Sequence, residues 1–109
     1  MPILKAEPEV GESIDDPSED AIFMLLDDIE EGQGNYLIIT RTADATGHTY
    51  AQTYRNDDGS YLVEYRAGGA DRHFQTIAAD MRTAHNLLTA WAFELDGWRE
   101  RAEWSRLEL

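Results

Sequence analysis

The spacing of apolar residues predicts a helix over residues 17–31. Its apolar face consists of four aliphatic side chains that recur at i, i+3, i+4 and i+7: Ile22, Leu25, Leu26 and Ile29. Asp16 can cap this helix, Pro17 suits its first position, and Glu19 stands where a capping box places its acid. Gly32 is a natural C-terminal stop. The chain therefore has one well-marked helix in its first third.

Four segments rich in β-branched or alternating apolar residues follow this helix and are predicted to be strands. They are Tyr36–Arg41, Tyr50–Arg55, Tyr61–Arg66 and Arg72–Ile77. Residues 56–59 (Asn-Asp-Asp-Gly) and the pair Gly68-Gly69 are typical of hairpin turns, and connections this short join antiparallel strands. A second amphipathic helix is predicted over Asp80–Leu95, and a closing strand over Ala102–Leu109.

The order α-β-β-β-β-α-β predicts an α+β fold, with an antiparallel four- to five-stranded meander sheet and two helices packed on it. Residues 17–109 are expected to form a single domain of ordinary size. Residues 1–16 combine low hydrophobicity, two prolines and high negative charge. This composition predicts an acidic flexible N-terminal tail, part of which can lie along the domain through Leu4 and Ile14.

Aromatic residues are concentrated in the predicted hairpin and the last third of the chain. We expect four tyrosines to meet on one face of the hairpin: Tyr50, Tyr54, Tyr61 and Tyr65. Such a face can pack internally, bind a partner, or join two copies of the chain in a homodimer. Trp91 is predicted to lie in the core, and Trp98 and Trp104 to fasten the closing strand to the second helix.

Charge is distributed very unevenly. The 109 residues carry a net charge of −13, and residues 1–32 alone hold one lysine and eleven acids, a net charge of −10. An acidic surface repels nucleic acid and attracts basic proteins. The absence of cysteine excludes disulfides and thiolate metal sites. The longest apolar run, Ala21–Leu26, is far shorter than the roughly 20 residues of a membrane span. With no secretory leader evident, we expect a soluble cytoplasmic protein that binds neither nucleic acid nor membranes.

Four acids in the last turns of the first helix are the strongest candidates for binding a partner: Asp27, Asp28, Glu30 and Glu31. Negative charge near a helix C-terminus opposes the helix dipole, so stability alone does not favour acids there. They can form a solvated face, a recognition patch for a basic protein, or a divalent metal site, although their spacing matches no defined metal loop. Asp57 and Asp58 in the predicted turn are a second candidate group.

The sequence contains no recognisable catalytic motif, and we expect neither enzymatic activity nor a cofactor or bound metal. The densest polar cluster is Asp71-Arg72-His73. In an alternative hypothesis it forms the site of a small enzyme or ligand-binding domain, in which Asp71 orients His73 and Arg72 holds an anion. A purely structural role, at the start of a strand after a Gly-Gly turn, is the other interpretation. The glycines form no phosphate-binding loop, and no serine lies in a nucleophile motif.

Residues 59–76 (GSYLVEYRAGGADRHFQT) and 87–109 (LLTAWAFELDGWRERAEWSRLEL) resemble small acidic actinobacterial proteins that are similar to the immunity proteins of polymorphic-toxin systems. Residues 21–41 are compatible with the same pattern. The resemblance implies a non-enzymatic inhibitor that occupies the active site of a toxin, such as a deaminase or nuclease. A basic protein partner is consistent with it. We expect the chain itself to be a monomer or a weak homodimer.

Overall fold

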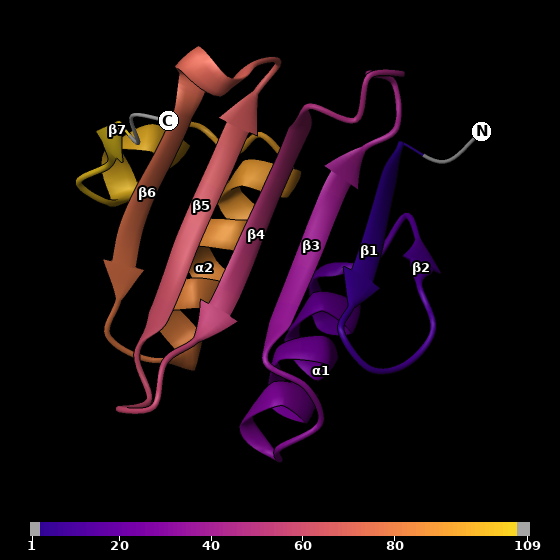
Figure 1. Cartoon of the computed structure of the whole chain (residues 1–109), viewed down its shortest axis with the longest axis vertical. Coiled ribbons are helices and arrows are strands. Elements are labelled where there is room, and N and C mark those ends of the chain that lie inside the picture. The colour runs from indigo at the N-terminus through magenta and orange to yellow at the C-terminus, as the bar shows by residue number, and fades with distance from the viewer. Residues whose placement is uncertain (1–2, 107–109) are drawn as a thin grey trace.

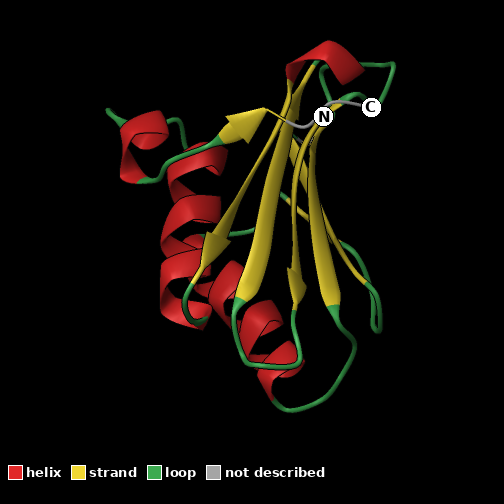
Figure 2. Cartoon of the chain, turned by 60° about the vertical axis from the view of Figure 1, so that its left-hand side comes forward, coloured by secondary structure: helices red, strands yellow, loops and turns green. Residues whose placement is uncertain are grey.

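The computed structural model describes residues 3–106, which form an antiparallel sheet with two helices on one of its faces (Figures 1 and 2). The sheet has seven strands in the order β2-β1-β3-β4-β5-β6-β7. The strands are β1 (Leu4–Pro8), β2 (Ile14–Asp15), β3 (Tyr36–Arg41), β4 (Thr49–Arg55), β5 (Tyr61–Ala67), β6 (His73–Ala78) and β7 (Ser105–Arg106). The predicted α+β class and antiparallel arrangement are confirmed, whereas the predicted strand count of four to five is too low.

The two additional strands lie in the segment that was predicted to be a flexible tail. Over residues 4–15 this prediction is wrong, because β1 pairs with β3 along its whole length and β2 pairs with β1. Leu4 and Ala6 alternate onto the helix side and are buried, which is enough to dock a short strand despite the surrounding charge. Asp16 fixes the segment further, since its carboxylate accepts hydrogen bonds from the backbone N–H groups of Ile3 (2.6 Å) and Leu4 (3.0 Å).

Helix α1 (Glu19–Glu30) begins two residues later than predicted. Ser18, and not Asp16, is its N-cap, and the Ser18 hydroxyl accepts from the N–H of Ala21 at 3.1 Å. Asp16 is unsuited to this position because its backbone has a positive φ of 46° and its carboxylate is bonded to β1. The four predicted aliphatic residues are all buried, so the apolar pattern of α1 is confirmed.

Helix α2 (Met81–Ala92) also begins close to its predicted start, with Asp80 as a side-chain cap that accepts from the N–H of Thr83. It contacts α1, and the ring of His85 on α2 packs edge-on against Phe23. Trp91 is 5% exposed, as predicted for a core residue. Figure 2 shows both helices on the same side of the sheet. Neither is long and apolar enough to cross a membrane, and the same holds for every other helix in residues 3–106.

The chain after α2 is mostly irregular, and the predicted closing strand shrinks to the two residues of β7. The end of that prediction, residues 107–109, lies outside the described residues. A short 3-10 helix, η2 (Trp98–Arg101), precedes β7. Trp98 and Trp104 both pack edge-on against Tyr65 of β5, with ring centroids 5.0 and 4.8 Å away. These aromatics therefore fasten the C-terminal segment directly to the sheet.

The register of β4 and β5 places the four tyrosines on two different faces. Tyr54 pairs with Leu62, so it lies on the face of Leu62 and not on that of Tyr61. Tyr61 and Tyr65 are buried on the helix side. Tyr50 and Tyr54 lie on the opposite side. The prediction that all four tyrosines share one face is wrong. The length of the β4–β5 turn sets which residues pair across the hairpin, and a change of one residue in that pairing moves a side chain to the other face.

The sheet thus has a covered face and an open face. The covered face packs on α1 and α2 and supplies most of the core, including Leu37, Ile39, Tyr61 and Val63, none more than 1% exposed. The open face, turned toward the viewer in Figure 1, has no helix on it. Its exposed apolar side chains are Tyr36, Tyr54 and Ile77.

Candidate partner-binding surface

The two groups of acids singled out from the sequence lie at the same end of the molecule. This end, at the bottom of Figure 1, is where α1 finishes, β3 begins and the turn between β4 and β5 lies. An ion pair between Glu30 of α1 and Arg55 connects the end of α1 to the end of β4, directly before the turn that carries the second group. We define the acidic end as the four exposed carboxylates there that have no partner among residues 3–106: Asp27, Asp28, Glu31 and Asp57.

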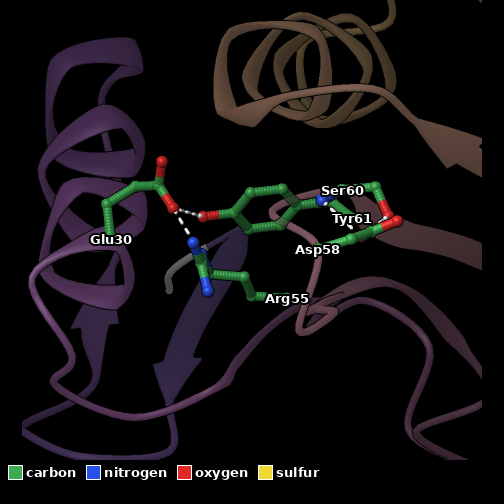
Figure 3. Close-up of polar contacts among 5 residues, drawn as sticks. All are labelled: Glu30, Arg55, Asp58, Ser60 and Tyr61. Carbon is green, nitrogen blue, oxygen red and sulfur yellow. Dashed lines mark hydrogen bonds and ion pairs between the residues drawn. The ribbon is translucent and has the colours of Figure 1, made fainter.

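Glu30 has an internal role and is not part of the acidic end. One carboxylate oxygen, Oε2, accepts hydrogen bonds from Arg55 Nε at 2.6 Å and from the Tyr61 hydroxyl at 2.9 Å (Figure 3). The hydrogen bond from Arg55 lowers the pKa of Glu30, with a smaller contribution from Tyr61. Burial, and then the bond to Glu30, raises the pKa of Tyr61 well above its usual 10.0. These contacts fasten the last turn of α1 to the covered face.

Asp58 is also engaged internally. Its Oδ1 accepts from the hydroxyl of Ser60 at 2.6 Å and from the backbone N–H of Ser60 at 2.9 Å, so it shapes the β4–β5 turn. These two hydrogen bonds lower the pKa of Asp58. Asp57 beside it is exposed. In each of the two predicted groups, therefore, one acid makes internal hydrogen bonds, Glu30 in the first and Asp58 in the second. The other acids face solvent.

The exposed members of the acidic end are not neutralised by the protein. Residues 3–106 contain two ion pairs between arginine and glutamate, and only the one between Glu30 and Arg55 involves the first 32 residues. In the described part of the chain, the side chains of Asp27, Asp28 and Glu31 form no hydrogen bond or ion pair. A field of uncompensated negative charge at one end of a small protein attracts positively charged proteins over a distance of about 10 Å at moderate ionic strength.

The structure does not bring Asp71, Arg72 and His73 together as a site. Asp71 and Arg72 lie in an exposed 3-10 turn, η1 (Ala70–Arg72). His73 begins β6 on the open face and is only 3% exposed. Its hydrogen-bond partners are Glu64 and Arg66 of β5, so Glu64 takes the orienting position that the sequence assigned to Asp71. An imidazole so thoroughly covered cannot reach a substrate, which argues against the enzymatic alternative.

His73 belongs to a polar network on the open face that the sequence reading missed. Arg66 Nε donates to His73 Nδ1 at 3.0 Å. A guanidinium can only donate, so Nδ1 accepts, and the imidazole proton resides on Nε2, which donates to Glu64 Oε2 at 2.7 Å. Gln52 Nε2 donates to the other oxygen of Glu64 at 3.0 Å. Period-two alternation in residues 61–66 could have placed Glu64 and Arg66 together on the face opposite Tyr61.

A hollow of about 290 Å³ lies next to this network on the open face. Tyr36, Ile38, Gln52, Tyr54, Leu62 and Glu64 line it. Tyr36 and Tyr54 are direct cross-strand partners, as are Gln52 and Glu64 on the next layer of the same face. The hollow is slightly smaller than the roughly 300–1,000 Å³ of sites for drug-sized ligands. It is therefore suited to a single side chain.

No group of three or more histidine, aspartate or glutamate side chains in residues 3–106 is arranged to hold a metal ion. Comparisons of the chain with protein-family models, with curated proteins and with solved structures found no match.

Proposed function

We propose that this chain is a small, non-enzymatic, cytoplasmic binding protein whose acidic end docks onto a basic protein. The observation that carries the proposal is the exposure of Asp27, Asp28 and Glu31, without internal partners, at the C-terminal end of α1. These three acids oppose the helix dipole and repel each other, and no side-chain contact among residues 3–106 offsets that cost. A complementary positive surface on a partner would offset it.

The resemblance to immunity proteins gives this partner a chemical class. A toxin that acts on nucleic acid needs a basic cleft to hold phosphates, and an acidic helix end can occupy such a cleft. A tight inhibitor of this kind typically buries about 1,600 Å² in total, so the acidic end would be one part of a larger contact. Its main contribution would be a fast, salt-sensitive association.

The test is affinity capture from source-cell lysate with three versions of the protein at low and high salt. The first is the native chain, and the second carries Asp27→Asn, Asp28→Asn and Glu31→Gln. The matched control carries Asp96→Asn, Glu100→Gln and Glu103→Gln, which removes three exposed acids beyond α2. We expect the native and control chains to retain the same basic protein at low salt and the second chain to lose it. Equal capture by all three would refute the role of Asp27, Asp28 and Glu31.

A further inference from the structure

The hollow on the open face has the chemistry of a site for a positively charged side chain. Two of its walls are the aromatic rings of Tyr36 and Tyr54, whose electron-rich faces attract cations. Two others are aliphatic, from Ile38 and Leu62, and can pack along a hydrocarbon stem. Gln52, Thr53 and Glu64 complete the lining, and Glu64 supplies a carboxylate. Aromatic faces, aliphatic walls and one carboxylate together match an amphipathic cation.

Two polar side chains of the hollow, Gln52 and Glu64, offer oxygen atoms that can accept hydrogen bonds. Gln52 directs its amide nitrogen to Glu64, so the acceptors that these two side chains offer are the carbonyl oxygen of Gln52 and the carboxylate of Glu64. The Glu64 side chain is 13% exposed and is held by Gln52 and His73. A carboxylate that is already fixed in place loses little further freedom when a ligand binds.

Arg66, two residues after Glu64 on β5, forms no ion pair with it. Arg66 is bonded to the far nitrogen of the His73 ring, so the imidazole stands between the guanidinium and Glu64. The guanidinium of Arg66 lies over the ring of Tyr50 instead, 5.7 Å from its centroid. With His73 carrying a single proton on Nε2, the hydrogen bond to Glu64 comes from a neutral donor. The hollow therefore keeps a negative wall.

The hollow also lies at the same end of the sheet as the exposed acids. Tyr36 is the first residue of β3, Tyr54 is next to the last residue of β4, and Leu62 follows the first residue of β5. This is where the β4–β5 turn and the end of α1 lie in Figure 1. The hollow is on the open face and α1 is on the covered face, so one basic partner reaches both by wrapping around this end of the sheet.

We propose that the hollow binds one arginine side chain of the basic partner, with its guanidinium against Tyr36 and Tyr54 and its N–H groups donating to Glu64. Arginine fits better than lysine because its flat guanidinium stacks on aromatic rings and presents several donors in a fixed geometry. A buried arginine of this kind is a frequent anchor of protein interfaces. This inference rests on the proposed function for the identity of the partner, but its chemistry can be tested without one.

The experiment is an NMR titration of the ¹⁵N-labelled full chain with Nα-acetyl-arginine amide. We expect saturable shifts at the backbone amides of the residues that line the hollow, with a dissociation constant on the order of 1–10 mM. The neutral analogue Nα-acetyl-citrulline amide should give no saturable shift. Shifts that do not saturate, or that are confined to the acidic end, would overturn the proposal. Binding of Nα-acetyl-lysine amide with equal affinity would overturn the assignment to arginine.

Substitutions test how much individual residues of the hollow contribute to binding of the arginine probe. Glu64→Gln should weaken the arginine probe at least about tenfold while still accepting a hydrogen bond. Because Glu64 is part of a network, Tyr54→Leu provides a second test at an exposed position that takes no part in that network. It should weaken binding about two- to fivefold. The control Ile77→Ala, on the same face but outside the hollow, should bind as the native chain does. If Glu64→Gln and Tyr54→Leu both bind like the native chain, the proposal is wrong.

The result of the titration with the arginine probe does not depend on whether the proposed function is correct. The variant with Asp27→Asn, Asp28→Asn and Glu31→Gln should bind the arginine probe as well as the native chain does. Failure of the probe to bind would leave capture of a basic protein by the acidic end untouched. Failure of capture would leave the affinity of the hollow for arginine untouched.

Discussion

The two helices of this protein are alike in architecture and unlike in charge. Each has twelve residues, begins at a side-chain cap and covers the same face of the sheet. Yet residues 1–32 carry a net charge of −10, whereas residues 80–109 carry four basic and six acidic residues, a net charge of −2. Because α2 packs on the sheet without such charge, the acids of α1 other than Glu30, which binds Arg55 and Tyr61, are not a requirement of the fold.

The C-terminal ends of the two helices show the difference most clearly. At the end of α2 the guanidinium of Arg41 donates to the carbonyl oxygen of Trp91 at 2.6 Å and stacks on the indole ring of that residue. A cation at this position is favoured by the helix dipole. At the end of α1 the nearest guanidinium, that of Arg55, binds Glu30, and the acidic neighbours of Glu30 face solvent. One helix end is built for stability, and the other carries charge that stability does not explain.

The largest expected effect tests whether the two helices contribute equally to the core. Leu26 of α1 and Leu88 of α2 are both fully buried. Leu26→Ala and Leu88→Ala should each lower the free energy of unfolding by about 2–5 kcal/mol, measured by urea denaturation. A cost well under about 1 kcal/mol for Leu26→Ala alone would mean that α1 is not firmly docked.

The next largest effect is the difference in stability between substitutions at Glu30, which has internal partners, and at its exposed neighbour Glu31. Glu30→Ala removes the acceptor of Arg55 and of the buried Tyr61 hydroxyl, and should lower the free energy of unfolding by about 1–3 kcal/mol. Glu31→Ala, one residue further along, should change it by less than about 0.5 kcal/mol. Equal effects of the two substitutions in thermal denaturation would remove the distinction between them.

The contact between Glu30 and Arg55 also predicts how stability depends on pH. The pKa of Glu30 is lower in the folded chain than its ordinary value of 4.5, because Arg55 donates a hydrogen bond to the carboxylate. The folded state therefore binds fewer protons than the unfolded state, and the contribution of Glu30 is complete at neutral pH and lost as the pH falls below about 4.5. The difference in free energy of unfolding between the native chain and Glu30→Gln should shrink as the pH falls from about 6 to about 2–3, the range in which carboxyl groups take up their protons. A difference that stays constant across this range would contradict the assignment.

The smallest effect concerns the exposed acids themselves. Replacing Asp27, Asp28 and Glu31 by their amides should raise the free energy of unfolding by about 0.5–2 kcal/mol in total at low salt, since unfavourable dipole and like-charge terms are removed. The gain should fade at high salt. The matched replacements at Asp96, Glu100 and Glu103 should have little effect. A loss of stability in the first variant would show that these acids serve the fold.

Much of the fold could be predicted because it depends on periodicity. The apolar stripe of α1 and the exact bounds of β3 follow from the spacing of apolar residues. β1 was missed because Leu4 and Ala6 are too few to outweigh the charge around them, and only pairing with β3 stabilises the strand. Likewise, local capping rules favoured Asp16, whereas tertiary contacts with β1 decided its actual role.

The site could be predicted only in part, for a similar reason. Charge density identified the acids near residues 27–31 and 57–58, but the internal role of Glu30 depends on Arg55 and Tyr61, which are distant in sequence. The hollow depends on the register of three strands, and one residue of slip would have placed Tyr54 and Glu64 on the covered face.

The most direct test of the acidic end is the association rate of the captured basic partner as a function of ionic strength. For the native chain and for the control with Asp96→Asn, Glu100→Gln and Glu103→Gln, the rate should fall steeply as salt rises. For the chain with Asp27→Asn, Asp28→Asn and Glu31→Gln, it should be about tenfold lower at low salt and nearly flat. Superimposable curves for all three chains would show that the acids of α1 do not guide the partner.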